Sequence, residues 1–332
     1  MKQFSIVAPA DLEHASRLLA APNTAALAGG VDVLDLRKQA IAEPATSVNL
    51  KALAGLDAIE VKPGGELHIG ALVKLHAVAT APILQERFTA ISRAAGEAAT
   101  PQIRNLATVG GNLLQRPRCW YFRNPLVNCL KKGGDRCYSI GGLNRYHAIL
   151  GGGPSFIVHP SNLAPALIAY GASARITGPA GERVVALEKF FTLPAVDPKR
   201  ENDLRAGEII TGVIVPPPAP GARSIYLEVR EKQSFDWPLA SVAVVLTLSG
   251  DGKSVRDVKI VLGAVAPIPW RVPAAEQAVI GAPLDEAHAR AAADAALAGA
   301  QPMSDNAYKI TIAKTIVRRA LLAAAEPAAA RS

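Results

Sequence analysis

Hydrophobic and polar positions alternate in short blocks along the first 55 residues. "FSIVAP" has the length and composition of a short strand, and "DLEHASRLLA" spaces its apolar residues near a period of 3.6, as an amphipathic helix does. The same pair recurs as "TAALAGG" and "DVLDLRKQAI". The pattern predicts strand, helix, strand and helix, an α/β unit with a glycine turn in its middle.

Residues 56–220 carry shorter apolar blocks separated by glycine and proline. We expect strands in "ELHIGALVKL", "ALIAYGASARIT" and "GEIITGVIVPPP", and a helix in "LQERFTAISRAAGEAA". Consecutive prolines can join neither a helix nor a strand ladder, so "PPPAPG" (216–221) is the clearest linker. We therefore place a domain boundary at residue 220.

Beyond the linker, three strand-like runs precede two alanine-rich helices. The strands are "SIYLEVREK", "LASVAVVLTLSG" and "VRDVKIVLGAV", and the helices are "DEAHARAAADAALAGA" and "SDNAYKITIAKTIVRRALLAAA". "GDGKS" lacks the earlier glycine of a P-loop and is typical of a hairpin turn, while "AAAEPAAARS" is typical of a frayed tail. The predicted fold class is α+β, with a domain at 1–220 in lobes of about 1–55 and 56–220, and a smaller α+β domain at 221–332.

Composition indicates an ordinary globular protein. The chain has 332 residues, of which 50% are hydrophobic, and contains no run of 18 apolar residues. Its first twenty residues carry charges where a signal peptide needs an apolar core, so we expect a cytoplasmic protein, periplasmic only if a partner carries it there. The net charge of +8 is spread over 36 basic and 28 acidic residues, which favours a diffuse solvated surface over a nucleic-acid site. We expect neither nucleic acid nor membrane as a partner.

Two glycine turns are candidate anion cradles. Ala28, Gly29 and Gly30 lie between a predicted strand and helix, and a second turn is "ATVGGN", with Thr108, Gly110, Gly111 and Asn112. Glycine permits close backbone approach, and N–H groups at such turns can bind phosphate. A single double-glycine sequence of this kind could simply form a tight connection between a strand and a helix. Two of them together suit the binding of the pyrophosphate of a dinucleotide. Neither matches G-x-G-x-x-G, so a Rossmann nicotinamide site is not supported.

All the cysteines lie within 19 residues. Nine residues separate Cys119 from Cys129, and seven separate Cys129 from Cys137. Three cysteines cannot form a disulfide framework, and these spacings are too long for zinc knuckles, so a looped iron–sulfur site fits better. Plain packing of buried thiols is the alternative, and the neighbouring aromatic and basic residues also resemble an RNA-binding knuckle. His147 and His159 are further candidate ligands, although a lone histidine is more often structural.

"LAGGVDVLDL", "RNLATVGGNLLQRPRCWYFR" and "HPSNLAPALIA", in this order, resemble the FAD-binding medium subunit of the molybdenum hydroxylases, the xanthine dehydrogenase and aldehyde oxidoreductase family. The resemblance covers nearly the whole chain, including "VREKQSFDWPLASVAVVL". It implies a two-lobed FAD-binding domain of the vanillyl-alcohol oxidase and para-cresol methylhydroxylase (PCMH) type, followed by the smaller C-terminal domain. It implies FAD contacts, and no catalytic residue, at Leu27, Ala28, Gly29, Gly30, Val31, Asp32, Val33, Thr108, Gly110, Gly111, Asn112 and Asn162.

The same resemblance implies an assembly and a role. In such proteins a molybdopterin-containing large subunit oxidises the substrate, and electrons cross two [2Fe–2S] clusters of a small subunit to FAD. From FAD they leave to an external acceptor. The chain is thus expected to be the electron-transfer flavoprotein subunit of an oxidoreductase that acts on aldehydes or aromatic and N-heterocyclic compounds.

The cysteine segment, 118–155, resembles the branch of this family that carries an extra [4Fe–4S] cluster. That branch has a fourth cysteine four residues before the "HPSD" histidine, where this chain has Ser155. We expect Cys119, Cys129 and Cys137 to hold the iron, with Ser155 at the fourth position; water, His147, a [3Fe–4S] cluster and no cluster are the alternatives.

Two further departures from the family pattern are Asn162, in place of the usual aspartate, and Glu228, where relatives often have lysine. We assign no flavin contact to Glu228. Two rival functions remain: a stand-alone FAD-dependent oxidase of the same fold, and a zinc- or RNA-binding protein that uses the cysteine segment. A visible spectrum would separate them.

Overall fold

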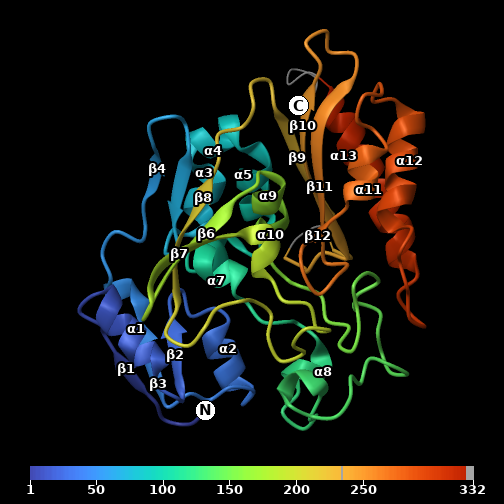
Figure 1. Ribbon diagram of the computed structural model, residues 1–332. Coiled ribbons are helices and arrows are strands. Elements are labelled where there is room, and N and C mark those ends of the chain that lie inside the picture. Colours follow the sequence, from blue (N-terminus) through green and yellow to red (C-terminus); the bar gives the residue numbers. More distant parts are fainter. Residues whose placement is uncertain (233–234, 327–332) are drawn as a thin grey trace.

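The computed structural model describes residues 1–232 and 235–326 (Figure 1). Within these residues the strands form three sheets, and helices lie between them along the chain. Helices and strands are mixed throughout, so the predicted α+β class is confirmed.

The first lobe is built on a parallel sheet of order β1-β3-β2. Parallel neighbours need crossover connections, and the two helices of the predicted strand–helix–strand–helix pattern supply them. Asp11 starts the first helix because its side chain accepts a hydrogen bond from the His14 amide at 2.7 Å. The elements are β1 (Ser5–Val7), α1 (Leu12–Ala20), β2 (Thr24–Leu27), α2 (Val33–Lys38), β3 (Thr46–Asn49) and the short 3-10 helix η1 (Leu50–Ala52).

The second lobe is an antiparallel sheet of order β4-β5-β8-β6-β7. Its buried side chains, among them Leu67, Val213 and Ala174, join the surrounding helices in the largest hydrophobic core. The strands are β4 (Ile59–Val61), β5 (Leu67–Gly70), β6 (Ser173–Gly178), β7 (Gly181–Ala186) and β8 (Ile209–Val215). The helices are α3 (Leu75–Thr80), α4 (Pro82–Arg87), α5 (Thr89–Glu97), α6 (Pro101–Arg104), α7 (Val109–Leu113), α9 (Leu163–Ala169) and α10 (Leu187–Phe190).

Two sequence predictions in this lobe are wrong. The single helix expected over 84–99 breaks at Phe88, which leaves the helical region so that its ring can pack, fully buried, 5.3 Å from the ring of Tyr170. The strand expected over 166–177 begins as the end of α9, because an apolar run buried on all sides has no period that distinguishes helix from strand.

The cysteine segment is mostly irregular and lies beside α2 at the base of the molecule (Figure 1). It contains two short helical turns, α8 (Trp120–Arg123) and η2 (Leu130–Lys132). Its small core joins Phe122 and Cys129 to Leu36 of α2. This packing fixes the segment against the first lobe.

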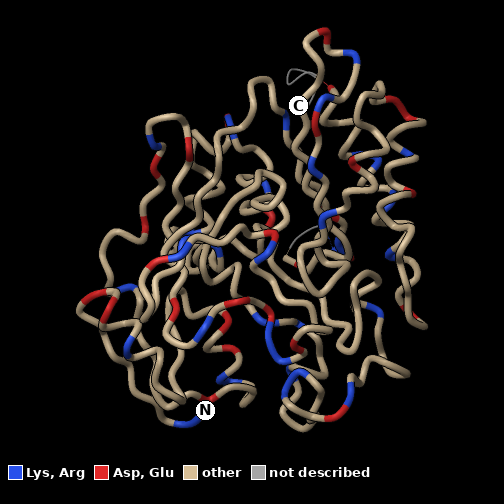
Figure 2. Tube along the Cα trace, in the orientation of Figure 1, with Lys and Arg blue, Asp and Glu red and all other residues tan. Residues whose placement is uncertain are grey.

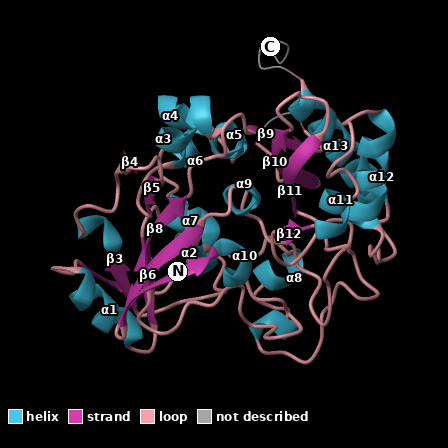
Figure 3. Ribbon diagram, turned by 45° about the horizontal axis from the view of Figure 1, so that its top comes forward, coloured by secondary structure: helices cyan, strands magenta, loops and turns pink. Residues whose placement is uncertain are grey.

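The C-terminal sheet has hydrophobic side chains on both of its faces. Val242 and Val244 of its central strand enter a second core with the C-terminal helices, while Ala243 between them enters the core of the larger domain. Figures 1 and 3 show the long helices along its outer side. The elements are β9 (Arg223–Val229), β10 (Ala240–Leu248), β11 (Val255–Gly263), β12 (Trp270–Arg271), α11 (Pro273–Gln277), α12 (Glu286–Leu297) and α13 (Tyr308–Ala325).

Residues 216–221 connect β8 of one sheet to β9 of another, and the domain boundary at residue 220 stays a prediction. The hairpin turn predicted at "GDGKS" is confirmed between β10 and β11, whereas most of the predicted tail lies outside the described residues. Basic residues are scattered along the trace rather than gathered on one element (Figure 2). No helix among the described residues is long and apolar enough to cross a membrane.

Candidate functional site

The first glycine turn connects β2 to α2 and packs against the approach to the second. A Cβ atom on Gly29 would lie 2.2 Å from the carbonyl oxygen of Leu106, so only glycine fits this contact. Gly30 has φ +77°, a left-handed conformation that favours glycine. The two candidate cradles, 75 or more residues apart in the chain, are therefore neighbours in space.

The backbone amides of the two turns differ in what they are free to bind. Around the second turn, Thr108 caps α7 by accepting from the Gly111 amide at 3.2 Å, and the Gly110 amide donates to Ala71 at 2.9 Å. The amides of Val109 and Asn112 also have backbone partners. In the first turn, by contrast, the amides of Gly29, Gly30, Val31 and Asp32 donate to no acceptor among the described residues. The free donors that an anion needs are thus concentrated in the first turn.

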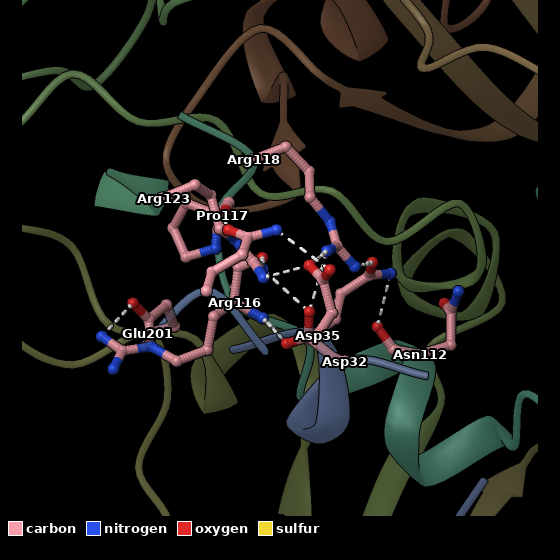
Figure 4. Close-up of polar contacts among 10 residues, drawn as sticks. Asp32, Asp35, Asn112, Arg116, Pro117, Arg118, Arg123 and Glu201 are labelled. Carbon is pink, nitrogen blue, oxygen red and sulfur yellow. Dashed lines mark hydrogen bonds and ion pairs between the residues drawn. The ribbon is translucent and has the colours of Figure 1, made fainter. Parts of the chain in front are cut away.

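The side chain of Asp32 contacts arginines that lie at the start of the cysteine segment or just before it (Figure 4). Its Oδ1 lies 2.9 Å from Arg118 Nη1 and 2.8 Å from Arg123 Nη2, and its Oδ2 accepts from the Arg116 amide at 2.8 Å. Arg123 also pairs with Asp35 at 2.9 Å. These contacts tie the cysteine segment directly to the turn, and no sequence motif predicted them.

A second ion-pair group continues this network. Arg116 forms two hydrogen bonds with Glu201, at 3.0 and 3.1 Å, and the buried Lys131 lies 2.7 Å from the same carboxylate. Burial lowers the pKa of Arg118, whose guanidinium also lies 4.7 Å from the centre of the Trp237 ring in the C-terminal domain. The network therefore joins the first lobe, the cysteine segment and the smaller domain.

Asn112 and Asn162 belong to one hydrogen-bonded group. Asn112 Oδ1 accepts from the Ser161 hydroxyl at 2.6 Å, and the next residue, Asn162, is the N-cap residue of α9. Asn162 Nδ2 donates to Glu228 at 2.9 Å. The structure thus places the predicted site residue Asn162 next to the second turn, and the residues predicted to contact FAD remain predictions.

Two histidines, one within the cysteine segment and one shortly after it, differ in their surroundings. His159 is fully buried, with its ring 4.6 Å from that of Phe191, and burial lowers its pKa to about 3. Its Nε2 has no partner among the described residues. His147 Nε2 lies 3.2 Å from Cys119 Sγ, and burial lowers the pKa of His147 to about 4. Both imidazoles are accordingly neutral at physiological pH.

The three cysteines are free thiols in one part of the fold. Burial raises the pKa of Cys119 to about 11, with smaller contributions from Cys137 and Cys129 nearby. Among the described residues no group of three or more His, Cys, Asp or Glu side chains could hold a metal ion. Ser155 is buried, and within the described chain its hydroxyl makes no hydrogen bond to a cysteine. The arrangement does not fit a metal centre as it stands.

Comparison with known proteins shows the family of the chain. The family described as FAD binding domain in molybdopterin dehydrogenase matches residues 2–218, and the CO dehydrogenase flavoprotein C-terminal domain matches residues 225–324. The aldehyde oxidoreductase FAD-binding subunit of Escherichia coli K12 is 37% identical over 88% of this chain and 89% of its own length. The carbon monoxide dehydrogenase medium chain of Hydrogenophaga pseudoflava is 29% identical over 97% of each chain.

Solved structures agree with these matches. A carbon monoxide dehydrogenase structure from Hydrogenophaga pseudoflava superposes with a TM-score of 0.77 at 27% identity over 97% of each chain. The quinoline 2-oxidoreductase of Pseudomonas putida 86 gives 0.76 at 26% identity over 98% of each chain. Fold and matches together define an FAD-binding oxidoreductase subunit. The chain belongs to the FAD-binding medium subunits of the molybdenum hydroxylase family.

Proposed function

We propose that this chain is the electron-transfer subunit of a heterotrimeric molybdenum hydroxylase that oxidises aldehydes or aromatic and N-heterocyclic compounds. Its partners are a molybdopterin-containing large subunit, a [2Fe–2S] small subunit and an external electron acceptor. Relatives named as an aldehyde oxidoreductase FAD-binding subunit, a nicotinate dehydrogenase FAD-subunit and a nicotine 6-hydroxylase medium subunit support this substrate range. We place the complex in the cytoplasm, or in the periplasm when a partner carries the export signal.

One structural observation carries the assignment of the FAD site. The amides of Gly29, Gly30, Val31 and Asp32 in the first turn donate to no acceptor in the described part of the chain, and Gly29 packs against Leu106, just before the second turn. Free amides suit the pyrophosphate of FAD, so the residues of this chain fit the cofactor. When bound, FAD supplies the redox chemistry, and the protein binds and orients it. We propose that residues 27–33 of the first turn hold the pyrophosphate. Residues 108–112 of the second turn, together with Asn162, border the cofactor from the opposite side.

In the proposed site, Arg116, Arg118 and Arg123, which we call the arginine network, have a supporting role. Asp32 lies within the turn, but its carboxylate pairs with the guanidinium groups of Arg118 and Arg123 and also accepts from the backbone amide of Arg116. The pairing therefore neutralises the one acidic side chain of the turn and fixes the backbone whose amides face the anion.

We also propose that Cys119, Cys129 and Cys137 hold an iron–sulfur cluster, [4Fe–4S] or [3Fe–4S], with Ser155 at the fourth position. The clustering of every thiol of the chain in one segment supports this proposal. The geometry described above does not assemble a metal site, so cluster binding would require the segment to rearrange. No step of electron transfer is assigned to the cluster.

Purification of the complex from its native host, with metal and flavin analysis, tests the function. We expect stoichiometric FAD together with a molybdenum-containing large subunit and a [2Fe–2S] subunit. Isolation of a monomer that retains FAD and oxidises a substrate unaided would instead identify a stand-alone oxidase. For the cysteine segment, iron analysis and electron paramagnetic resonance of the wild type and Ser155→Cys are the measurement; an iron-free segment in both would overturn the cluster proposal.

A further inference from the structure

Asn162 and Glu228 lie in contact across the two domains. Asn162 Nδ2 donates to Glu228 Oε2 at 2.9 Å and to the Tyr226 hydroxyl at 3.4 Å. Asn162 is the N-cap residue of α9 in the larger domain, whereas Tyr226 and Glu228 belong to β9 of the smaller one. Since Ser161 bonds to Asn112, this contact borders the second glycine turn.

Glu228 is a buried carboxylate with three donors. Only 5% of its side chain is exposed, and it accepts from the Tyr226 hydroxyl at 2.7 Å, from Asn162 and from Arg230 Nε. Burial raises the pKa of Glu228, while the three donors oppose that change. Arg230 also bonds to Glu97 of α5 at 2.6 Å, which makes a second link between the domains.

The carboxylate dictates which end of the Asn162 amide faces it. An ionised carboxylate only accepts hydrogen bonds, so Nδ2, the donor end, must point to Glu228. The acceptor end, Oδ1, then lies on the other side of the amide carbon. Within the part of the chain that the structure describes, no donor is hydrogen-bonded to Oδ1. A single acceptor oxygen is therefore held, without a protein partner, beside the second turn.

We propose that Glu228 is a positioning residue of the flavin site, which holds Asn162 with Oδ1 turned toward a hydroxyl or N–H donor of bound FAD. The proposal rests on the placement of FAD beside Asn162 in the proposed function. It also accounts for the amide at position 162. An aspartate there would set two carboxylates within hydrogen-bonding distance of each other, whereas asparagine supplies an acceptor without a second charge.

A series of substitutions at position 228 tests the role, with FAD affinity measured by fluorescence titration of the FAD-free protein. Glu228→Gln retains an acceptor for Asn162 Nδ2 and should bind FAD within about threefold of the wild type. Glu228→Ala loses the acceptor and should bind roughly tenfold more weakly, the equivalent of about one net hydrogen bond. Glu228→Lys offers only donors, turns the amide around and should bind more weakly still.

If residue 228 acts by orienting the side chain at position 162, a suitable double substitution should restore FAD affinity. In Asn162→Asp with Glu228→Lys the lysine donates to one oxygen of the new carboxylate, and the other oxygen still faces FAD. We expect affinity to return to within about threefold of the wild type. Asn162→Asp alone places like charges together and should bind FAD roughly tenfold more weakly.

Glu97→Gln is the matched control, because it weakens the Arg230 link between the domains without touching Asn162. It should leave FAD affinity unchanged. Thermal unfolding of the FAD-free variants distinguishes this role from one in which the Glu228–Arg230 ion pair merely holds the two domains together. If the ion pair were what mattered, Glu228→Gln and Glu228→Ala would lose FAD affinity equally. If Glu228 positions Asn162, Glu228→Gln should keep its FAD affinity even where its unfolding temperature falls.

Two results would overturn the inference, and a third would overturn the proposed site. Glu228 would have no positioning role if Glu228→Ala bound FAD as tightly as the wild type while Asn162→Ala bound FAD more weakly. Tight binding by a folded Glu228→Lys would lead to the same conclusion. Unchanged affinity in Asn162→Ala would show instead that FAD does not border this residue.

Discussion

Gly29 is the residue at which the two glycine turns touch. Its missing Cβ leaves room for the carbonyl of Leu106, at a position where an added carbon would stand 2.2 Å from the oxygen. Because the obstacle is backbone, it cannot swing away as a side chain would. Gly29→Ala should therefore separate the turns, lower the free energy of unfolding by about 1–3 kcal/mol and abolish tight FAD binding. Denaturant unfolding and FAD titration measure the two effects.

Gly299→Ala is the control for this substitution, since a Cβ there would meet nothing within 4 Å. It should match the wild type in both measurements. If Gly29→Ala retained FAD at wild-type affinity, the contact between the turns would have no part in cofactor binding.

Lys309 is a buried cation of helix α13 without a carboxylate partner among the described residues. Its Nζ donates to the carbonyls of Ala264 at 2.6 Å, His147 at 3.2 Å and Tyr146 at 3.4 Å, and burial lowers its pKa to about 7. The unfolded chain keeps this proton up to the ordinary pKa of 10.5, so between pH 7 and 10.5 the unfolded state binds more protons. The contribution of Lys309 to stability should accordingly rise with pH in this window.

Lys309→Met removes the titrating group and should flatten that rise, which in the wild type amounts to at most about 1.4 kcal/mol per pH unit. Urea unfolding at a series of pH values above 7 is the measurement. Lys314→Met, on the same helix but with 39% of the lysine side chain exposed, should retain the wild-type slope. Parallel profiles for the wild type and Lys309→Met would mean that Lys309 does not titrate in this range.

At the level of elements, the arginine network attaches the irregular cysteine segment to α2. Arg123 is central, because it pairs with Asp32 at 2.8 Å and Asp35 at 2.9 Å and donates to the carbonyl of Pro117 at 2.8 Å. Arg123→Gln should lower the free energy of unfolding by on the order of 2–3 kcal/mol. This is less than the cost of breaking a fully buried ion pair, because 39% of the Asp35 side chain is exposed.

The loss of stability in Arg123→Gln should be confined to the cysteine segment and α2. Hydrogen exchange should accelerate in both elements and remain unchanged in the C-terminal sheet. Arg290→Gln, which breaks an exposed pair within α12, is the control and should alter neither stability nor exchange measurably. Uniform acceleration throughout the chain would contradict an anchoring role that is confined to the segment.

The sequence predicted helix α1 correctly, because its exposed face gives the helix a clear period. The predicted positions of strands β9 to β11 are also confirmed, although the C-terminal sheet is buried on both faces. Prediction failed where burial on all sides removes the period, as at α9, or where a buried ring interrupts a helix, as at Phe88. In the site, local composition indicated both glycine turns. It could not show which turn keeps its amides free, or that Asp32 pairs with distant arginines, because both depend on long-range contacts.

For the whole molecule, the C-terminal sheet belongs to two hydrophobic cores at once. Tyr226, Ala243 and Val261 face the core of the larger domain, while Val242 and Leu262 face the helices of the smaller one. Unfolding of the smaller domain would expose apolar surface of the larger one, at a cost of roughly 25 cal/mol per Å². We therefore expect the chain to unfold in a single transition, although two family domains match it.

Leu321→Ala tests this coupling from the second core, which contains none of the residues proposed to bind FAD. Leu321 is fully buried in the second core, so the substitution should lower the free energy of unfolding by about 2–5 kcal/mol. Calorimetry should show one transition at a reduced temperature, with calorimetric and van't Hoff enthalpies equal. Release of FAD, followed by flavin fluorescence, should shift by the same amount, because the larger domain loses the sheet that closes its core. Two separate transitions, with FAD released at the wild-type temperature, would show that the cores are independent.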